Sequence, residues 1–296
     1  MKGRDRRRHR TTLVLIARYR PVANNRVSRR SGSQEEVRTM KERIRGFAAG
    51  LEVDDVGFAA ASDYRSPLSP PLESIFPGAR SIVVLAYKEL DSCDSPDAHI
   101  AMNGRMDLME FSRSCNYKLA RHLERSFGAR TMTVPASYPM AQNEETRGTV
   151  GQVSLRHAAV AAGLGAFGSN NLVVHPRFGC RAVFTAVLTD LEILPDPPVA
   201  ENPCTACGLC VQGCPGKALD EPGRTDVMKC VKNNMPYGLS GAIRFWGKYG
   251  GVSAAERKAM LRDPNFWRLY QAGHIGPQYF CFTCMNVCPV GRKATA

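Results

Sequence analysis

Cysteines form two short runs near the C-terminal end of this 296-residue chain. The first run, CTACGLCVQGCPG, begins at Cys204, and the second, CFTCMNVCPVG, begins at Cys281. Each run ends on a cysteine that proline follows directly, at Cys214 and Cys288. Together the runs contain seven thiols, one fewer than two four-ligand metal sites need. The position of an eighth thiol is therefore the first question that the sequence raises.

The spacing C-x2-C-x2-C-x3-C-P of the first run is typical of loops that bind [4Fe–4S] clusters in bacterial ferredoxins. Three closely spaced thiolates can bind three corners of one cubane, whereas the fourth cysteine of such a run serves the other cluster. By the same logic Cys288 should cross over from the second run. The predicted ligands of the first cluster are Cys204, Cys207, Cys210 and Cys288.

The second cluster would then take Cys214, Cys281 and Cys284, and it needs one more thiolate. Cys230 is the only other cysteine in the C-terminal part, so we predict that it is the fourth ligand. Zinc is the competing interpretation, because C-x2-C pairs also form tetrahedral zinc sites. The close spacing within the first run and the two Cys-Pro pairs favour iron and sulfide. The other three cysteines lack ligand spacing and are interpreted as structural: Cys93, Cys115 and Cys180.

Composition indicates a folded chain in a reducing compartment. Hydrophobic residues make up 44% of the sequence, which is enough to bury a sizeable core in two domains. The only apolar run near the N-terminus, TTLVLIA, is too short to cross a membrane or to serve as a secretory signal. We therefore expect a cytoplasmic protein with no membrane partner, in which clustered cysteines bind metal.

Positive charge is concentrated at the N-terminus. Residues 1–39 contain twelve Lys and Arg against three Asp and Glu, which leaves a net +4 of the total +13 for the rest. We interpret this segment as a disordered basic tail, or as one that precedes the native start at Met40. A nucleic-acid-binding tail is the alternative, and we expect no nucleic-acid partner.

Alternating patterns predict a layered α/β domain over residues 40–195, followed by a cysteine-rich domain over 196–296. Helices are expected from about Ser33 to Leu51, over 109–128 with a stop at Gly128, and over 153–163. Strands are expected over 56–61, 81–90, 129–135, 171–174 and 182–190. The proline-rich stretch 194–203 marks the domain boundary, and 253–273 should form one or two helices between the cysteine runs.

The stretch GLGAFGSNN contains a literal G-x-G-x-x-G at Gly163, Gly165 and Gly168. A dinucleotide site requires a strand before this motif and a helix after it. The pattern here is reversed, with a predicted helix before and a strand after, which argues against a Rossmann site. The glycines either end a helix or let the backbone approach a flat cofactor, together with Asn170.

The segment AAGLGAFGSNNLVVHPRFGCRAVFTAVLTDLEILPD, followed by the first cysteine run, resembles the corrinoid-dependent epoxyqueuosine reductases, which are related to reductive dehalogenases. The resemblance extends over about residues 40–296. It implies a nitroreductase-like, cobalamin-binding α/β domain packed on a two-[4Fe–4S] ferredoxin-like domain. It also supports Cys230 as a ligand, because that family takes a cysteine from between the runs.

By this resemblance, electrons would pass from a flavodoxin- or ferredoxin-type donor through both clusters to a corrinoid, for reduction of an unknown substrate such as a small molecule. A carrier that docks a partner reductase without cobalamin is the alternative. The aspartate acid of the family falls near Thr149, unless a gap brings Glu144 or Glu145 into its place. The interval 231–280 is also long, and the chain stops eight residues after Cys288 without the family's C-terminal extension. We therefore expect a substrate other than epoxyqueuosine in tRNA. Candidate proton donors are Tyr138, His157 and His175.

Overall fold

The computed structural model describes residues 34–136, 143–144, 146, 149–276 and 280–292. Residues 1–33 of the predicted basic tail lie outside the described residues, and so does the candidate proton donor Tyr138. No helix within the described ranges is long and apolar enough to cross a membrane.

Helices and strands alternate in the first two thirds of the chain, and the described residues after the first cysteine run form helices without strands. The longer helices are α1 (Gln34–Ala49), α3 (Ala98–Phe127), α4 (Leu155–Ala161), α6 (Val227–Asn234), α7 (Leu239–Gly251), α8 (Ala254–Met260) and α9 (Pro264–His274). Short helices are α2 (Leu72–Ile75), α5 (Leu209–Gln212) and α10 (Thr283–Asn286), with 3-10 turns at Ala61–Asp63 and Asp91–Asp94. The strands are β1 (Asp55–Ala60), β2 (Ser81–Lys88), β3 (Thr131–Val134), β4 (Ala166–Phe167), β5 (Val173–Val174) and β6 (Ala182–Thr189).

The main sheet has four strands in the order β1-β2-β6-β3, and every pair is antiparallel. Ser81 of β2 pairs with Thr189 of β6, and Thr131 of β3 pairs with the same residue from the other side. The mixed α/β class expected from the sequence is confirmed, in its antiparallel form. The predicted strand over 171–174 is only the two-residue β5, which pairs with β4 in a separate ribbon.

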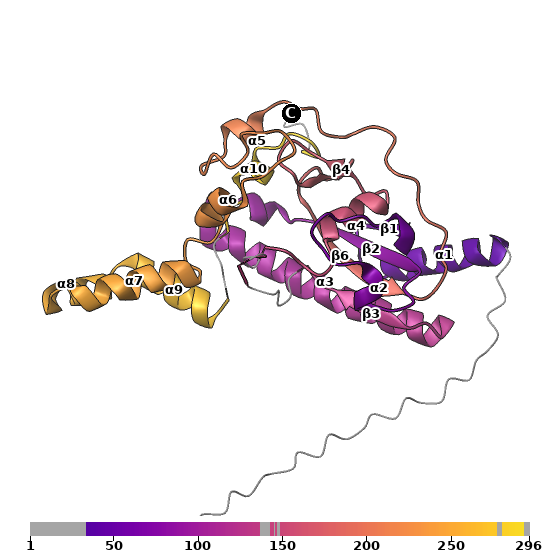
Figure 1. Ribbon diagram of the computed structural model, residues 1–296, viewed down its shortest axis with the longest axis horizontal. Coiled ribbons are helices and arrows are strands. Elements are labelled where there is room, and N and C mark those ends of the chain that lie inside the picture. The colour runs from indigo at the N-terminus through magenta and orange to yellow at the C-terminus, as the bar shows by residue number, and fades with distance from the viewer. Residues whose placement is uncertain (1–33, 137–142, 145, 147–148, 277–279, 293–296) are drawn as a thin grey trace, which may run out of the picture.

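Strand β2 lies between two hydrophobic cores, as Figure 1 shows from the helices on both sides of the sheet. Its residues alternate between faces, because successive side chains of a strand point in opposite directions. Ile82, Val84 and Ala86 pack with α4 on one face. Val83, Leu85 and Tyr87 pack with α1 and α3 on the other face. A continuous apolar strand therefore serves both layers of helices.

Helix α3 is longer than the sequence predicts. It ends at Phe127, and Gly128 adopts a left-handed conformation (φ 63°) as the predicted stop, because glycine has no side chain to clash there. It begins at Ala98 and not near residue 109. The side chain of Asp97 accepts hydrogen bonds from the amides of His99 and Ile100, so the N-cap signal lay twelve residues before the predicted start.

The segment between the cysteine runs forms a helical arm, α7 to α9, which projects from the body of the protein (Figure 1). Residues 253–273 form two helices, α8 and α9, and this agrees with one of the predicted alternatives. Helices α6 and α7 were not expected. Ring contacts of Phe245 and Trp246 in α7 with Phe266 of α9 join the two longer helices of the arm.

Candidate metal centre

One cavity brings together thiols from distant parts of the chain. Cys204, Cys207 and Cys210 of the first run line it together with Cys288 of the second run. These are the four residues predicted for the first cluster. A fifth thiol, that of Cys180, lines the same cavity and comes from the loop before β6. The structure thus brings Cys288 of the second run to the three cysteines of the first run.

The first cysteine loop has a backbone conformation suited to an anionic group. Ala206 and Gly208 both have positive φ angles, of 53° and 75°. Such turns direct successive N–H groups into a concave site for anions. Burial alone would raise the pKa of Cys204, but hydrogen bonds from Ser169 and the Ala206 backbone prevail and lower that pKa. These donors favour the thiolate at Cys204, whereas burial raises the pKa of Cys210 in the same loop.

The other four predicted ligands form a second group. Cys214, Cys230 and Cys281 are all close enough to Cys284 for their charges to act on it, and so, more weakly, is Cys210 of the first group. Burial and these neighbouring thiols raise the pKa of Cys284 to about 12. The amide of Ala218 donates to the Cys214 sulfur over 3.3 Å. An electropositive iron core would relieve the repulsion among four such thiolates, because metal binding lowers the pKa of its ligands.

The donor sets therefore fit two cubane clusters, each with four thiols of which one comes from the other run. Around both groups, backbone or hydroxyl donors lie near sulfur, as at Ser169 and Cys204 (3.7 Å). Within the residues that the structure describes, no three His, Cys, Asp or Glu side chains converge closely enough to hold a single metal ion.

The turn that carries Cys288 packs directly against the loop that carries Cys180. A Cβ atom on Gly179 would lie 2.0 Å from the carbonyl oxygen of Val290. One on Gly291 would lie 2.3 Å from the carbonyl carbon of Phe178. Both positions require glycine, because any side chain would separate the two backbones.

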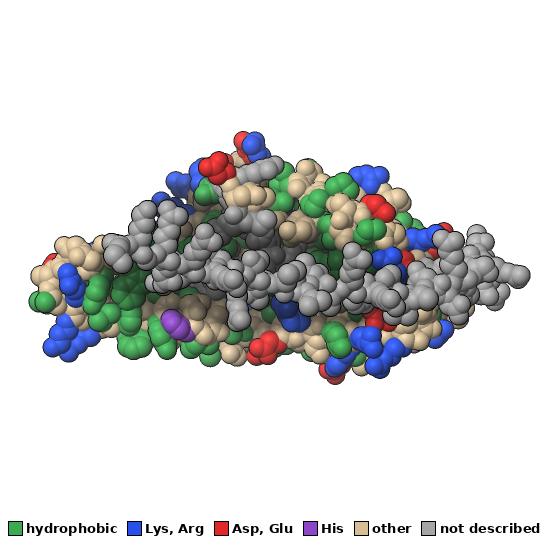
Figure 2. Space-filling view, turned by 60° about the horizontal axis from the view of Figure 1, so that its bottom comes forward, with side chains coloured by type: hydrophobic (Ala, Val, Ile, Leu, Met, Phe, Trp, Pro, Cys, Tyr) green, Lys and Arg blue, Asp and Glu red, His purple; other side chains and the backbone are tan. Residues whose placement is uncertain are grey.

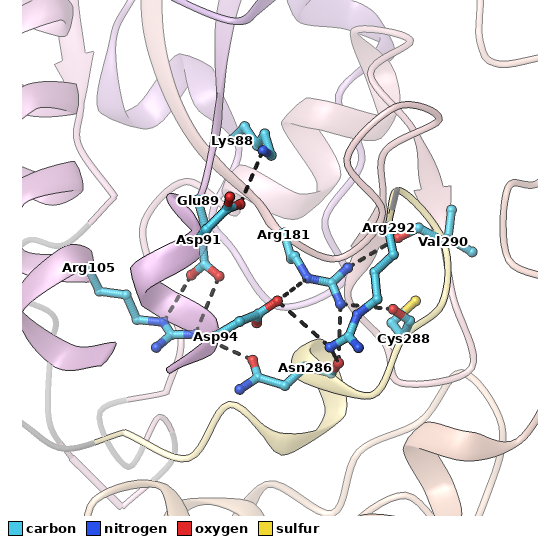
Figure 3. Close-up of polar contacts among 10 residues, drawn as sticks. All are labelled: Lys88, Glu89, Asp91, Asp94, Arg105, Arg181, Asn286, Cys288, Val290 and Arg292. Atoms are coloured by element: carbon cyan, nitrogen blue, oxygen red, sulfur yellow. Dashed lines mark hydrogen bonds and ion pairs between the residues drawn. The ribbon is translucent and has the colours of Figure 1, made fainter. Parts of the chain in front are cut away.

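A buried arginine holds the same turn (Figure 3). Arg181 is only 6% exposed, and its guanidinium donates to the carbonyl oxygens of Asn286 (3.1 Å), Cys288 (2.9 Å) and Val290 (3.2 Å). Its Nε also donates to a carboxylate oxygen of Asp94 at 3.0 Å. The planar donor set of arginine suits several acceptors at once. Arg181 therefore joins the second cysteine run to the main sheet.

A second buried arginine supports the preceding turn. Arg105 of α3 pairs with Glu89 through two hydrogen bonds of 3.0 and 3.4 Å, and both side chains are almost fully buried. Its guanidinium carbon lies 3.4 Å from the ring centroid of Phe282, next to Cys281. The second cysteine run is thus fastened to the α/β part at two points.

The glycine-rich stretch begins after α4, contains the two-residue β4 and ends before β5, so the predicted helix before it and strand after it are confirmed. Gly163 has φ 70°, and a Cβ atom there would lie 2.3 Å from the carbonyl oxygen of Pro197. A Cβ atom on Gly165 would lie 2.4 Å from that of Val174. Gly168 instead lies near the first cysteine run, since its Cβ position is 2.7 Å from a methyl group of Val174 and 3.5 Å from the Cys204 sulfur. Of the predicted cofactor-binding residues, the structure brings Gly168 and Asn170 to the metal centre.

The two described histidine candidates have different surroundings. The Nδ1 atom of His157 shares a hydrogen bond of 2.8 Å with the hydroxyl of Ser154. Burial lowers the pKa of His157, and the positive charge of Arg156 lowers it further. His175 is 2% exposed; its Nδ1 accepts from the Arg177 amide, so its Nε2 donates to Asp55 (3.2 Å). Both nitrogens of His175 are thus engaged within the fold, which is typical of a structural residue.

A separate hollow opens between α3 and the end of β3. Three methionines line it, with Glu110 and Arg113, and it also reaches Pro135, Gly276 and Phe280. Its volume is about 300 Å³. A neighbouring apolar hollow of about 220 Å³ shares Pro135 and is lined by Gln152. The buried Oε1 of Gln152 has no hydrogen-bond partner within the described part of the chain. An acceptor in this position suits a ligand that carries amide donors.

Sequence reasoning missed the roles of Cys180 and Arg181. Neither has a spacing signal, because both meet the second cysteine run only through tertiary packing. A charged residue directly before the apolar run AVFTAVLTD was the only hint of Arg181. It places a charge at the start of a buried strand, where a partner must lie close by.

Comparison with known proteins relates the chain to redox enzymes. No protein-family model matches it. It is 23% identical over 276 residues to the epoxyqueuosine reductase of Bacillus cereus, which covers 86% of this chain and 65% of that protein. A crystal structure of an epoxyqueuosine reductase matches with a TM-score of 0.56 and 21% identity, over 86% of this chain and 66% of that one.

The chain also matches a reductive dehalogenase structure, which is described with a mechanism for B12-dependent dehalogenation. This match covers 80% of the present chain and 36% of the dehalogenase chain, with a TM-score of 0.52 and 17% identity. The chain spans 30 to 65% of the length of the curated relatives that it matches first. The structural matches show a shared fold. The chain is thus epoxyqueuosine reductase-like in sequence and fold, which confirms the resemblance seen in its glycine-rich stretch and first cysteine run.

Proposed function

We propose that this protein is an iron–sulfur oxidoreductase that moves electrons through two [4Fe–4S] clusters for the reduction of a substrate in its α/β part. The observation that carries the proposal is that thiols of both runs meet: Cys204, Cys207, Cys210 and Cys288 line one cavity, and Cys214, Cys230 and Cys281 lie near Cys284. In this proposal the cysteine-rich segment serves as a ferredoxin-like domain. The relatives named above support a reductase of this type.

Anaerobic reconstitution with iron and sulfide tests the clusters. The protein should bind about eight irons per chain, since two cubanes each hold four. Protein that stays colourless and retains zinc in place of iron would contradict the proposal. The same preparation without added sulfide serves as the control, because it can load metal but cannot form a cubane.

We further propose that a corrinoid binds at the hollows that meet at Pro135. When bound, a corrinoid supplies a cobalt centre capable of reductive chemistry. Gln152 would accept from its amide side chains, the three methionines would pack against its apolar surface, and Phe280 would connect the hollow to the loop of Cys281. The similarity to a B12-dependent dehalogenase structure supports this choice of cofactor.

Gel filtration with added cobalamin tests the corrinoid. The loaded protein should retain corrinoid absorbance, and Gln152→Ala should weaken retention, whereas the amide control Asn265→Ala in α9 should not. A protein that binds both clusters but never a corrinoid would support the alternative function, an electron carrier for a partner reductase.

The substrate is proposed to be a small molecule other than epoxyqueuosine in tRNA. By count from the glycine-rich stretch, the family's aspartate falls near Thr149, whose hydroxyl donates to the carbonyl oxygen of Thr146 over 2.8 Å. A threonine hydroxyl is a far weaker acid than a carboxyl group. An epoxyqueuosine-containing tRNA stem loop, offered to the loaded and reduced protein, should yield no queuosine. Formation of queuosine would overturn this part of the proposal.

We propose that the electron donor is an acidic flavodoxin- or ferredoxin-type protein that docks on the helical arm. The arm is inserted between Cys230 and Cys281, two proposed ligands of the second cluster. Residues 239–276 contain six Lys and Arg against two Asp and Glu. Large apolar side chains on the arm are exposed, among them Trp246 (53%) and Trp267 (51%). Figure 2 shows hydrophobic and basic side chains gathered at this end of the molecule. Aromatic and arginine residues are typical of protein interfaces.

A further inference from the structure

The turn that joins β4 to β5 brings a hydroxyl to the first group of thiols. In this turn the amide of Asn171 donates to the carbonyl oxygen of Gly168 over 2.9 Å. The Oγ atom of Ser169, inside the turn, lies in hydrogen-bond contact with the Cys204 sulfur at 3.7 Å. Ser169 also lines the first cavity. The two residues are 35 positions apart, so the contact depends on the fold and not on the cysteine spacing.

Backbone contacts hold both partners of this pair. The carbonyl oxygen of Ser169 accepts from the amide of Gly223 over 3.0 Å. The amide of Cys204 donates to the Oδ1 atom of Asn202 at 2.9 Å. The Nδ2 atom of Asn202 in turn donates to the carbonyl oxygen of Phe167 in β4 at 3.0 Å. The cysteine is therefore tied to the same ribbon that carries the hydroxyl.

The proton of this contact belongs to the serine once iron is bound. A hydroxyl can donate or accept a hydrogen bond, and so can a free thiol. A cysteine that binds metal is a thiolate and has no proton to donate. Ser169 must then be the donor, and hydrogen bonds to an ionised acceptor are stronger than neutral ones.

The second group of thiols has a hydroxyl of its own. The Oγ1 atom of Thr283 lies 3.5 Å from the Cys281 sulfur. Thr283 is the first residue of α10, two positions after that cysteine, so this contact is local to the second run. Thr283 does not line the first cavity. Each group of proposed ligands thus has one hydroxyl beside one of its sulfurs.

We propose that Ser169 and Thr283 are positioning residues whose hydroxyls donate to ligand sulfurs of different clusters and raise the two reduction potentials independently. The inference rests on the proposed function and deepens it. Reduction adds one electron to a cluster, and hydrogen bonds to its sulfurs stabilise the added negative charge. Neither hydroxyl forms a bond to iron. The first potential therefore depends on a residue of the α/β part, and the second on a residue of the cysteine run itself.

A redox titration of the reconstituted protein, followed by electron paramagnetic resonance, tests the inference. Ser169→Ala and Thr283→Val should each bind about eight irons, since all eight proposed ligands remain. Each variant should move one of the two reduction waves to a more negative potential, and the two should move different waves. Ser169→Ala should move the wave that persists in Cys230→Ala, which lacks a proposed ligand of the second cluster. Ser126→Ala is the control, because its hydroxyl contacts His122 on α3, and both waves should stay in place.

A second pair of variants isolates the hydroxyl of Ser169 from the shape of its side chain. Ser169→Thr and Ser169→Val have side chains of nearly equal shape, and only the threonine keeps a hydroxyl. The wave of the first cluster should lie at a more negative potential in the valine variant than in the threonine variant. This comparison decides the role of Ser169 even if Ser169→Ala loses iron. Equal potentials in the two variants would overturn that role, and so would the loss of about four irons in both.

The outcomes separate this inference from the proposed function. If wild-type protein binds no iron–sulfur cluster, the proposed function fails. If both clusters form and Ser169→Ala and Thr283→Val leave both waves where Ser126→Ala does, only the role of the hydroxyls fails. Movement of the same wave by both variants would also overturn the inference, because it assigns the two hydroxyls to different clusters.

Discussion

Arg181 Nη2 donates a hydrogen bond to the carbonyl oxygen of Cys288 at 2.9 Å, although 107 positions separate the two residues in the sequence. The arginine directly precedes the buried strand β6, and the cysteine belongs to the last turn of the metal centre. Through this contact the sheet sets where the crossing ligand of the first cluster lies. The predictions below follow from this and from the other contacts around the two thiol groups.

Arg181→Gln should weaken the first cluster. The shorter side chain cannot reach the carbonyl oxygens of Asn286, Cys288 and Val290, and it leaves Asp94 without its buried partner. We expect iron content to fall from about eight toward about four per chain, measured by iron analysis after anaerobic gel filtration. Arg224→Gln is the control, because Arg224 forms an exposed ion pair with Glu221, and this variant should keep all its iron. Full iron content in both variants would contradict the role of Arg181.

Glu89→Gln should destabilise the fold. Arg105 would lose its buried counterion, and the loss of one member of such a pair costs about 3–5 kcal/mol. The comparison is Glu192→Gln, whose pair with Arg80 is exposed and should contribute about 0–1 kcal/mol. Anaerobic urea denaturation followed by circular dichroism measures both. Equal denaturation midpoints for the two variants would show that the buried pair contributes nothing beyond a surface pair.

Cys230→Ala should damage the second cluster and spare the first. Burial and the charges of Cys281 and Cys214 raise the pKa of Cys230, so Cys230 lies near both thiols. It does not line the first cavity. We expect about four irons per chain and the loss of one of two cluster signals in electron paramagnetic resonance. Cys93→Ala, which removes a buried thiol outside both groups, should leave both signals intact. An unchanged spectrum in Cys230→Ala would remove Cys230 from the ligand set.

His157 should make stability depend on pH. Burial lowers its pKa in the folded protein below the usual 6.5, so the unfolded chain binds more protons as the pH falls. The stability that neutral His157 provides is complete above pH 6.5 and is lost as the pH falls below that value. His157→Gln should therefore lose less stability than the wild type between pH 7.5 and 5.5, measured by anaerobic urea denaturation. A parallel loss in both proteins would show that another group dominates.

Charge reversal on the arm should slow reduction by an acidic donor. Lys248→Glu reverses a charge on α7, the helix of the arm that also carries the exposed Trp246. We expect a several-fold lower rate of cluster reduction by purified reduced flavodoxin at low salt, and a smaller effect at high salt, because salt screens charge. The control Lys118→Glu on α3 should match the wild type, and reduction by dithionite should be equal in all three. If the clusters of Lys248→Glu are reduced by flavodoxin at the wild-type rate, and if wild-type protein binds anionic vesicles more tightly than Lys248→Glu does, the arm is a membrane contact and not a donor site.

The sequence by itself determined the kind of chemistry and much of the local structure. The spacing of Cys204, Cys207 and Cys210 is a property of one loop, so it can be recognised without knowledge of the fold. The apolar strand β2 and the glycine stop of α3 are local in the same sense. Short helical elements such as α5 and α10 could not be predicted, because four residues show no periodicity.

Only the tertiary structure decided what surrounds the metal centre. Cys180 and Arg181 lie far in sequence from Cys288, and nothing in their own neighbourhood indicates a sulfur or a carbonyl oxygen as a partner. They meet it because β6 is central in the antiparallel sheet and its preceding loop packs on the last cysteine turn through Gly179 and Gly291. Such contacts depend on how whole elements pack together, and a linear pattern of residues does not record that packing.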